Sequence, residues 1–339
     1  MDKDISVRRM DFLRLAGKTV LVTGATGLIG SNVIRTLVHL EKEFEHPINV
    51  IAVVRNETKA KKVFGEIYND IKIIEGDVVK GVVVSEKVDY IIHAASQTSS
   101  KRFIEQPLET IETAIQGTLN MLQIAKEKKV EKFVYLSTME VYGAPDTDGK
   151  VDEDHNTNLN TMVVRSCYPE SKRMCENLCV SYMEEYGVPV NVVRLTQTFG
   201  PGVLYYDDRI FAEFARCVIE KKDIILHTKG ETKRSYLYTQ DAVNAILTVL
   251  LKGERGQAYN AANEETYCSI LEMAEMVANR CAEGKIQVKI QVEDISKFGY
   301  APTLKINLDT SKLQALGWKP EVGLEEAYRQ LIMSMETCK

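Results

Sequence analysis

A tyrosine and a lysine four positions apart, Tyr168 and Lys172, are the first residues of this 339-residue chain whose spacing suggests chemistry. Residues at this spacing share one face of a helix. An ammonium group near a phenol stabilises the phenolate, so we expect Lys172 to lower the pKa of Tyr168 from its ordinary value of about 10. Tyr168 would then act as a general acid/base. Because Pro169 fits only the first helical turn, Tyr168 is predicted to lie at the helix start.

A hydroxyl at the end of a predicted strand is the second candidate. The strand Phe133 to Ser137 is followed by Thr138, and the sequence continues as Met-Glu-Val-Tyr-Gly. Side chains at the carboxyl ends of parallel strands face the ligand crevice, so Thr138 is placed to hydrogen-bond a substrate hydroxyl that is being oxidised. The alternative is a strand-end threonine that caps its own backbone.

Three glycines at a spacing of three form a candidate phosphate-binding turn. Gly24, Gly27 and Gly30 follow the apolar run Thr19 to Thr23 and precede an amphipathic helical pattern. Glycines let the backbone approach a pyrophosphate closely, and the helix N-terminus offers free N–H groups and a positive dipole end. The common fingerprint is G-x-G-x-x-G, so this turn is one residue longer. A glycine-rich turn without a ligand is the alternative.

The end of the second predicted strand bears on the choice between NAD and NADP. NAD binding usually places a carboxylate there, whereas an arginine suits the 2′-phosphate of NADP. Arg55 stands at this point, Lys59 follows, and the nearest acid, Glu57, comes late. The sequence therefore favours NADP slightly. Asp77, just past the third strand, is predicted either to meet the adenine edge or to cap its own loop.

An α/β scaffold is needed to bring these groups together. Strands are predicted at residues 19–23, 49–54, 71–75, 90–93, 133–137 and 190–195, and helices after the glycine turn and at 59–68, 108–128 and 171–186. Alternation with short links predicts a doubly wound parallel sheet of the Rossmann type. After Leu195 the pattern loosens, and Gly200-Pro201-Gly202 breaks the chain. We expect later segments to form a smaller, discontinuous α+β substrate domain over the strand C-terminal ends.

The composition is that of an ordinary globular enzyme. Apolar residues make up 45% and charged residues 27%, and the net charge is −5 without a basic block. Nucleic acid and membrane surfaces are therefore unexpected partners. No apolar run reaches the length of a membrane span, and the first 17 residues lack a secretory signal. Seven cysteines without a C-x-x-C pair, Cys175 and Cys179 among them, predict reduced thiols in a cytoplasmic protein and no metal site.

In this order the motifs resemble the extended short-chain dehydrogenase/reductase family, and more closely its nucleotide-sugar epimerase/dehydratase branch. The resemblance runs from about residue 18 to 335. Besides the residues above, it rests on His93-Ala94-Ala95, Gly117-Thr118 with Asn120, Arg194-Leu195, Phe199-Gly200-Pro201-Gly202, Arg234 before Tyr238, Asp241 and Leu316-Gly317-Trp318-Lys319-Pro320.

The resemblance implies transient oxidation of a sugar at C4. Tyr168 would take the proton of the C4 hydroxyl, helped by Thr138, and Lys172 would hold the nicotinamide ribose. The cofactor-binding set would be Gly24, Thr26, Gly27, Leu28, Ile29, Gly30, Arg55, Asp77, Val78, Ala94, Ala95, Ser96, Tyr168 and Lys172. The substrate-binding set would be Ser96, Gln197, Arg209 and Arg234, with Gln197 and Arg234 on the diphosphate. Residues 1–195, with 235–265 returning, would form the dinucleotide-binding domain, and 196–339 would mainly bind the nucleotide sugar.

Departures from the branch pattern narrow the reaction. Gln197 and Ala114 stand where asparagine is usual, and Pro169 where glycine is usual. Sugar 4,6-dehydratases carry Asp-Glu after the threonine. Here the pair is Met139-Glu140, so the dehydration acid is absent. Glu140, with the Ser96/Ser99 loop, is similar to the decarboxylases that act on UDP-glucuronate.

We therefore expect an epimerase first, with a catalytic role for Glu140, and a decarboxylase as the alternative. With NADP, a keto-sugar reductase is a third choice, and a non-catalytic dinucleotide-binding sensor is the choice from another class. The resemblance also implies a homodimer through helices near 108–128 and 171–186.

Overall fold

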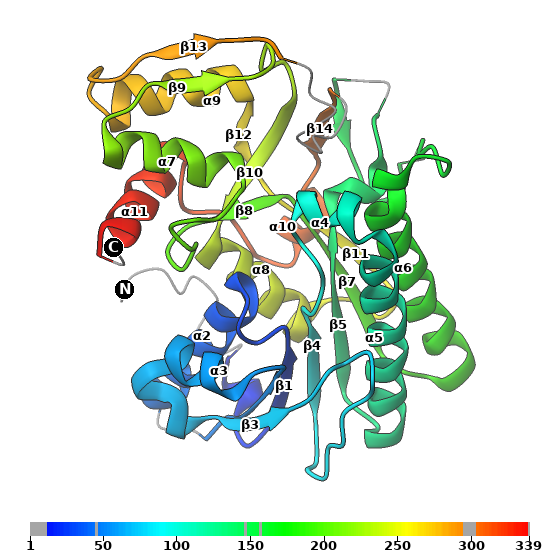
Figure 1. Ribbon diagram of the computed structural model, residues 1–339. Coiled ribbons are helices and arrows are strands. Elements are labelled where there is room, and N and C mark those ends of the chain that lie inside the picture. The colour runs from blue at the N-terminus through cyan, green and yellow to red at the C-terminus, as the bar shows by residue number, and fades with distance from the viewer. Residues whose placement is uncertain (1–11, 45–46, 146–147, 156–157, 294–302, 338–339) are drawn as a thin grey trace.

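A parallel seven-stranded sheet organises the chain (Figure 1). The computed structural model describes residues 12–44, 47–145, 148–155, 158–293 and 303–337. The strand order is β11-β7-β5-β4-β1-β2-β3, and every neighbouring pair is parallel. The strands are β1 (Thr19–Thr23), β2 (Asn49–Val54), β3 (Lys72–Glu75), β4 (Tyr90–His93), β5 (Lys132–Thr138), β7 (Val190–Leu195) and β11 (Ala258–Ala261).

Helices cover both faces of this sheet, which confirms the predicted doubly wound fold. On one face, α2 (Leu28–Phe44), α3 (Glu57–Phe64) and α8 (Thr239–Lys252) pack on Val20 and Val22 of β1. On the other, α5 (Pro107–Lys128) and α6 (Cys167–Tyr186) pack on Leu21, and the two helices run side by side (Figure 1). Successive residues of a strand point to opposite faces, so one apolar run serves both layers.

Several predicted boundaries differ from those in the structure. The helix predicted at 59–68 is α3, which ends at Phe64 and continues as a 3-10 helix over Gly65–Asp70. α3 starts at Glu57, two residues before the predicted start, because the Asn56 side chain caps it by accepting a hydrogen bond from the Lys59 N–H. α6 begins at Cys167 rather than at 171, so Pro169 lies in its first turn and Tyr168 at its start, as predicted. β3 begins at Lys72.

The segments after Leu195 are divided between the large sheet and a second layer. α8 and β11 join the large sheet, and β11 pairs with β7 at its edge. A smaller mixed sheet has the order β12-β10-β14-β6, with β8 also on β10. Its strands are β6 (Lys150–Val151), β8 (Gln197–Phe199), β10 (Lys233–Tyr238), β12 (Asn263–Ser269) and β14 (Lys305–Leu308). β9 (Ile224–Leu226) pairs with β13 (Val288–Ile290).

A second apolar core holds this upper layer together. It combines α7 (Ile210–Glu220), α9 (Ile270–Met276) and α11 (Leu324–Thr337) with Phe199 and Tyr236 of the smaller sheet. Leu28, at the start of α2, packs partly against the same core. The glycine turn therefore lies where the two layers meet.

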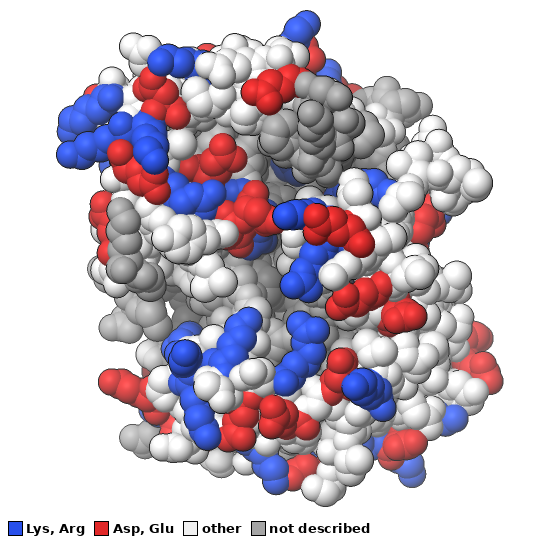
Figure 2. Space-filling view, viewed as in Figure 1, with Lys and Arg blue, Asp and Glu red and all other residues white. Residues whose placement is uncertain are grey.

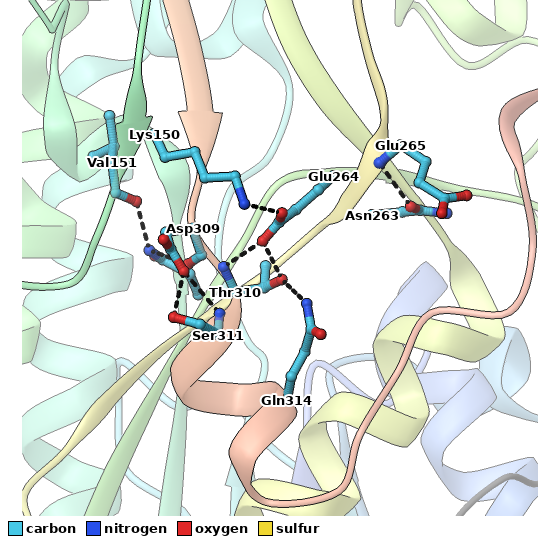
Figure 3. A network of polar contacts seen from close by, with 10 residues as sticks. Lys150, Val151, Asn263, Glu264, Glu265, Asp309, Thr310, Ser311 and Gln314 are labelled. Atoms are coloured by element: carbon cyan, nitrogen blue, oxygen red, sulfur yellow. Dashed lines mark hydrogen bonds and ion pairs between the residues drawn. The ribbon is translucent and has the colours of Figure 1, made fainter.

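A polar network fastens the smaller sheet to the large one (Figure 3). Glu264 of β12 pairs with Lys150 and accepts hydrogen bonds from the N–H and hydroxyl of Thr310, which precedes α10 (Ser311–Ala315). The buried amide of Asn260 in β11 donates to the Val151 and Asp309 carbonyls. The two layers are thus joined by specific hydrogen bonds as well as by apolar packing.

No helix among the described residues is both long and apolar enough to span a bilayer. Cys175 and Cys179 are free thiols, fully buried between α6 and the sheet.

Candidate active site

The glycine turn leaves the backbone bare beside the start of α2. Gly24 has a φ of +63°, and a Cβ there would lie 2.6 Å from the carbonyl of Ala94. A Cβ on Gly30 would collide with the Gly24 carbonyl. The first-turn N–H groups of a helix, here those of Leu28, Ile29 and Gly30, lack intrahelical partners and favour an anion. The turn therefore has the bare backbone and the free N–H groups that the glycine spacing predicts, and pyrophosphate binding there stays a prediction.

Later residues close over this helix start. A Cβ on Gly202 would lie 3.4 Å from the Leu28 Cδ1 and Asn32 Nδ2 atoms, so the Gly200–Gly202 bend sits against α2. Figure 2 shows a recess between the two halves of the molecule, and Lys and Arg side chains gather along its lower rim. In a chain of net charge −5, this local excess of positive charge favours an anionic ligand.

The end of β4 is fixed by a buried histidine. His93 Nδ1 is hydrogen-bonded to Thr23 Oγ1 at 2.7 Å, and Nε2 to Thr118 Oγ1 at 3.2 Å. The Ala95 N–H donates to Thr23 Oγ1 as well, at 3.2 Å. Burial lowers the pKa of His93 to about 3, with the charge of Lys172 as a second cause. A neutral His93 thus holds Ala94, Ala95 and the following Ser96 beside the glycine turn.

The residues expected near the adenosine lie at the ends of β2 and β3. Arg55 is exposed, and no hydrogen bond or ion pair joins its side chain to another described residue. Glu57 is engaged by the Tyr68 hydroxyl and by Lys61. Asp77 Oδ1 accepts the Val79 N–H at 2.9 Å, so the alternative of a loop cap is confirmed for this residue. Val78 is buried, and its carbonyl accepts from the Asn120 amide.

Thr138, Tyr168 and Lys172 come together at the carboxyl end of β5. The Thr138 hydroxyl hydrogen-bonds the Tyr168 side chain and also accepts the Glu140 N–H at 3.3 Å. The Lys172 ammonium donates to the Leu136 carbonyl at 2.8 Å and lies 6.0 Å from the centroid of the Tyr168 ring. Burial lowers the pKa of Lys172 to about 8.

The prediction that Lys172 lowers the pKa of Tyr168 is wrong for this structure. Tyr168 is buried, and this burial together with the charge of Glu140 raises the pKa of the phenol well above its ordinary value. The Thr138 hydrogen bond and the charges of Arg165 and Arg209 lower that pKa without cancelling the effect of burial. The ammonium of Lys172 is occupied by a main-chain carbonyl instead.

A comparison with protein families identifies this arrangement. The model of the NAD dependent epimerase/dehydratase family matches residues 20–262, which include the glycine turn, Thr138, Tyr168 and Lys172. The chain belongs to this family. This epimerase/dehydratase family is enzymatic and NAD-dependent, which confirms the predicted resemblance and the nicotinamide cofactor.

Related proteins cover nearly the whole chain. UDP-glucuronic acid decarboxylase 1 of Xenopus tropicalis is 30% identical over 319 residues, 93% of this chain and 71% of that protein. The dTDP-D-glucose 4,6-dehydratase of Mus musculus is 29% identical over 93% of this chain and 88% of its own. The crystal structure of UDP-glucuronic acid 4-epimerase from Bacillus cereus, in complex with UDP-glucuronic acid and NAD, has the same fold. Its TM-score is 0.78 at 21% identity, covering 95% of this chain and 100% of that one.

Of the residues expected to hold the substrate, three lie in the upper layer, and Ser96 follows β4 of the large sheet. Gln197 begins β8 and pairs in register with Tyr236 of β10. The Nε atom of Arg234, also on β10, is buried and has no hydrogen-bond partner among the residues that the structure describes. Arg209 lies close enough to Tyr168 to affect its pKa, but its guanidinium forms two hydrogen bonds with Asp207, at 2.9 and 2.6 Å. Ser96 donates to the Gln97 carbonyl.

Sequence reasoning missed a charge network behind the β5 strand end. Arg194 donates to both carboxylate oxygens of Glu176, at 3.1 and 2.7 Å, and Ser137 donates to one of them. Arg194 also donates to the Tyr142 hydroxyl, which donates to Asn260. Arg194 and Tyr142 belong to the motifs quoted above. Glu176 offered a signal too, because it falls four residues after Lys172 on α6.

Phe103 and Arg165 were also missed. Phe103, on α4 (Ser100–Glu105), stacks on the Tyr168 ring with a centroid distance of 4.3 Å and an interplanar angle of 13°. Arg165 forms an ion pair with Glu140 at 2.9 Å. No spacing rule connects Phe103 with position 168, because it reaches the site from α4. Arg165 offered a signal, because it lies three residues before Tyr168, in the 3-10 helix Val164–Ser166 that leads into α6.

Proposed function

We propose that this protein is a redox-neutral nucleotide-sugar enzyme, and specifically an epimerase that acts through transient oxidation at C4 of the sugar. The observation that carries the proposal is the meeting of the Thr138 hydroxyl, the Tyr168 phenol and the Lys172 ammonium at the carboxyl end of β5. The glycine turn, which we propose to hold the dinucleotide, lies on the same edge of the sheet. Hydroxyl, phenol and ammonium are the groups needed to remove a proton from a secondary alcohol.

In this proposal Tyr168 takes the proton from the C4 hydroxyl, and Thr138 orients that hydroxyl through the same hydrogen-bonding cluster. Lys172 holds the nicotinamide ribose and supplies positive charge near the phenol. A nicotinamide cofactor bound at the glycine turn would supply the acceptor for the C4 hydride, and in an epimerase this hydride would return to the opposite face of the keto sugar. Thr26, Gly27 and the first-turn N–H groups of Leu28 and Ile29 hold the pyrophosphate.

The choice between NAD and NADP, which differ at the 2′ position of the adenosine ribose, is a separate proposal. Arg55 is exposed and has no ion-pair partner in the described part of the chain, and Glu57 is occupied by Tyr68 and Lys61, which supports acceptance of NADP. Glu75, however, stands opposite Val54 in the β2–β3 register, so a carboxylate is also present at this edge. Comparing the dissociation constants of NAD and NADP for the wild type and Arg55→Ala tests the proposal. A variant that loses NADP affinity alone supports it, and equal affinities in both proteins contradict it.

Binding of the nucleotide sugar is proposed for the upper layer and the cleft below it. The unpartnered, buried Nε of Arg234 is a donor directed to an anion, since a buried guanidinium N–H without an acceptor is unfavourable. Gln197, which lies opposite Tyr236 on β8, the strand that pairs with the β10 strand of Arg234, is the second diphosphate contact that we propose. Ser96 and Arg209 would line the sugar side. Residues 1–195 with 235–265 would then bind the dinucleotide and 196–339 mainly the nucleotide sugar.

Decarboxylation of a nucleotide-linked uronate is the second candidate. It is supported by Glu140, which is held by Arg165 beside the Tyr168 cluster, and by the 30% identity to a protein named UDP-glucuronic acid decarboxylase 1. Loss of water has less support. Met139 occupies the position of the dehydration acid, and its side chain is buried beneath the site, where the Thr196 hydroxyl contacts its sulfur.

Mass spectrometry of the products from a panel of nucleotide sugars distinguishes these reactions. Unchanged mass with altered retention supports epimerisation. Loss of carbon dioxide supports decarboxylation, loss of water indicates dehydration, and a gain of two hydrogens indicates a reductase. Tyr168→Phe should lower turnover by at least about 100-fold while the cofactor still binds. A protein that only senses dinucleotides would convert none of the panel, and the enzyme proposal would then be rejected.

We also propose a homodimer formed through α5 and α6. These helices run side by side on one face of the sheet (Figure 1). Their outer surface exposes apolar side chains, with relative exposures of 73% for Leu108, 50% for Met174 and 43% for Val180. Apolar groups of this size on adjoining helices favour burial against a second copy.

A further inference from the structure

Phe103 and Arg165 enclose the Tyr168 ring from two elements that carry none of the proposed catalytic groups. Phe103 is 2% exposed and stacks on Tyr168, and the Arg165 guanidinium lies 4.7 Å from the centroid of the Phe103 ring. Stacked aromatic pairs and guanidinium groups over aromatic faces are both attractive geometries. The main chain of Phe103 is also held, because its carbonyl accepts from the Cys167 thiol at 3.3 Å.

The contacts around Tyr168 form a closed ring. Thr138 hydrogen-bonds Tyr168, and two residues later Glu140 pairs with Arg165 at 2.9 Å and 3.1 Å through its two carboxylate oxygens. Arg165 covers Phe103, and Phe103 stacks on Tyr168. Three short stretches of chain, at Phe103, at Thr138 to Glu140 and at Arg165, thus fix one phenol. Displacement of any one of them moves the ring relative to Thr138.

We propose that Arg165 and Phe103 are positioning residues for Tyr168, and that Arg165 offsets the charge of Glu140 so that the phenol keeps its working protonation range. This inference rests on the proposed function only in giving Tyr168 an acid/base role. The clamp of Arg165, Phe103 and Glu140 stands as geometry whatever the sugar.

Burial makes the balance of charge matter. Several titratable or charged groups face Tyr168. They are Glu140 and Arg165 of the clamp, Arg209 before α7, Thr138 and Tyr135 on β5, and Lys172 on the same helix as Tyr168. Of the charged groups, Glu140 raises the pKa of Tyr168, and Arg165 and Arg209 lower it. Asp207 forms two hydrogen bonds with Arg209, which leaves Arg165 as the charge in direct contact with Glu140.

Substitutions at positions 165 and 140 should therefore shift the pH dependence in opposite directions. A general base works as phenolate, so a higher pKa moves the ascending limb of kcat to higher pH. Arg165→Met should move the limb up and lower kcat at pH 7 by roughly tenfold, with KM changed less than about twofold. Glu140→Gln should move the limb down, and the double variant should return it close to the wild-type position. Arg165→Lys should restore part of the loss, because it keeps the charge but not the planar fork.

The stack itself is tested by Phe103→Leu, which keeps an apolar side chain but removes the ring. Its kcat should fall several-fold without a shift of the pH limb. Arg173→Met is the matched control, since Arg173 is an exposed residue of α6 that pairs with Glu170. This control should leave both the rate and the pH profile unchanged.

A direct measurement separates failure of the clamp from failure of the enzyme assignment. The 13Cζ resonance of Tyr168 in the NAD-bound protein, identified by its loss in Tyr168→Phe, should titrate at higher pH in Arg165→Met and at lower pH in Glu140→Gln. If no nucleotide sugar is converted, the proposed function fails and this titration still decides the clamp. If the resonance and the pH limb stay at their wild-type positions in both variants, the clamp proposal is overturned. Should Arg165→Met not fold, Arg165→Lys and Glu140→Gln carry the test.

Discussion

His93 is neutral at physiological pH because both ring nitrogens are bonded inside the core and burial lowers its pKa to about 3. The unfolded chain binds a proton here below its ordinary pKa of about 6.5, and the folded chain does not. The stabilising contribution is therefore complete above pH 6.5 and is lost as the pH falls towards 3. At pH 5 the folded state should have lost about 2 kcal/mol through this residue alone.

Urea unfolding at pH 7 and pH 5 measures this effect. His93→Gln should remove most of the pH-dependent difference in unfolding free energy, whatever its effect at pH 7. His39→Gln is the control, because His39 is partly exposed and forms an ion pair with Glu43 on the surface of α2. An unaltered pH dependence in His93→Gln would show that other groups carry the acid sensitivity.

At the scale of single elements, the β1–α2 turn depends on a bare backbone. Gly24→Ala should lower the unfolding free energy by about 2 kcal/mol or more and weaken NAD binding, since it combines a positive φ with a clash against Ala94. Gly17→Ala separates the two causes. Gly17 has a similar φ of +71°, but nothing lies within 4 Å of its added Cβ. Calorimetry with NAD should therefore show normal affinity in Gly17→Ala. Equal loss in both variants would mean that the clash is unimportant.

At the same scale, Glu176 of α6 joins two strands, because it accepts a hydrogen bond from Ser137 of β5 and forms an ion pair with Arg194 of β7. Glu176→Gln removes the charge partner of Arg194, whose side chain is only 14% exposed. An unpaired guanidinium at this depth should cost about 3 kcal/mol of unfolding free energy. Glu184→Gln, on an exposed face of the same helix, should cost little. Denaturant unfolding of the two variants is the measurement, and similar losses would exclude a special role for the Glu176–Arg194 pair.

The same elements show how far the sequence could predict the structure. β1, β2, β4 and β7 agree with the prediction residue for residue, because buried parallel strands are short, unbroken apolar runs. The Tyr168 cluster was also predictable, since helical spacing and strand-end position are local properties. The pKa direction of Tyr168 was not, because it depends on burial and on Glu140. The contacts of Phe103 and Arg165 were not predictable either, because they arise only when α4 and the segment before α6 fold together.

At the scale of the whole molecule, the homodimer proposal predicts that negative charges introduced on the outer surface of α6 convert the dimer into a monomer. Met174→Glu combined with Val180→Glu places two carboxylates on the exposed side of α6. Sedimentation velocity should show a dimer for the wild type and a monomer for the double variant, because burying unpaired carboxylates is unfavourable. Met333, which is 53% exposed on α11 in the upper layer, offers the control substitution Met333→Glu. A wild-type monomer would contradict the proposal.

The place of β11 has a consequence for synthesis on the ribosome. The outer edge of β7 stays without its neighbour until Ala258–Ala261 has been made, some 60 residues after β7 itself. A nascent chain that stops near residue 200 would therefore expose an unpaired, apolar strand edge of the kind that recruits other chains. Separate expression of residues 1–195 and 196–339 should therefore give aggregates rather than independent folding units. A chaperone that shields this strand edge would act in the interval between the synthesis of β7 and that of β11.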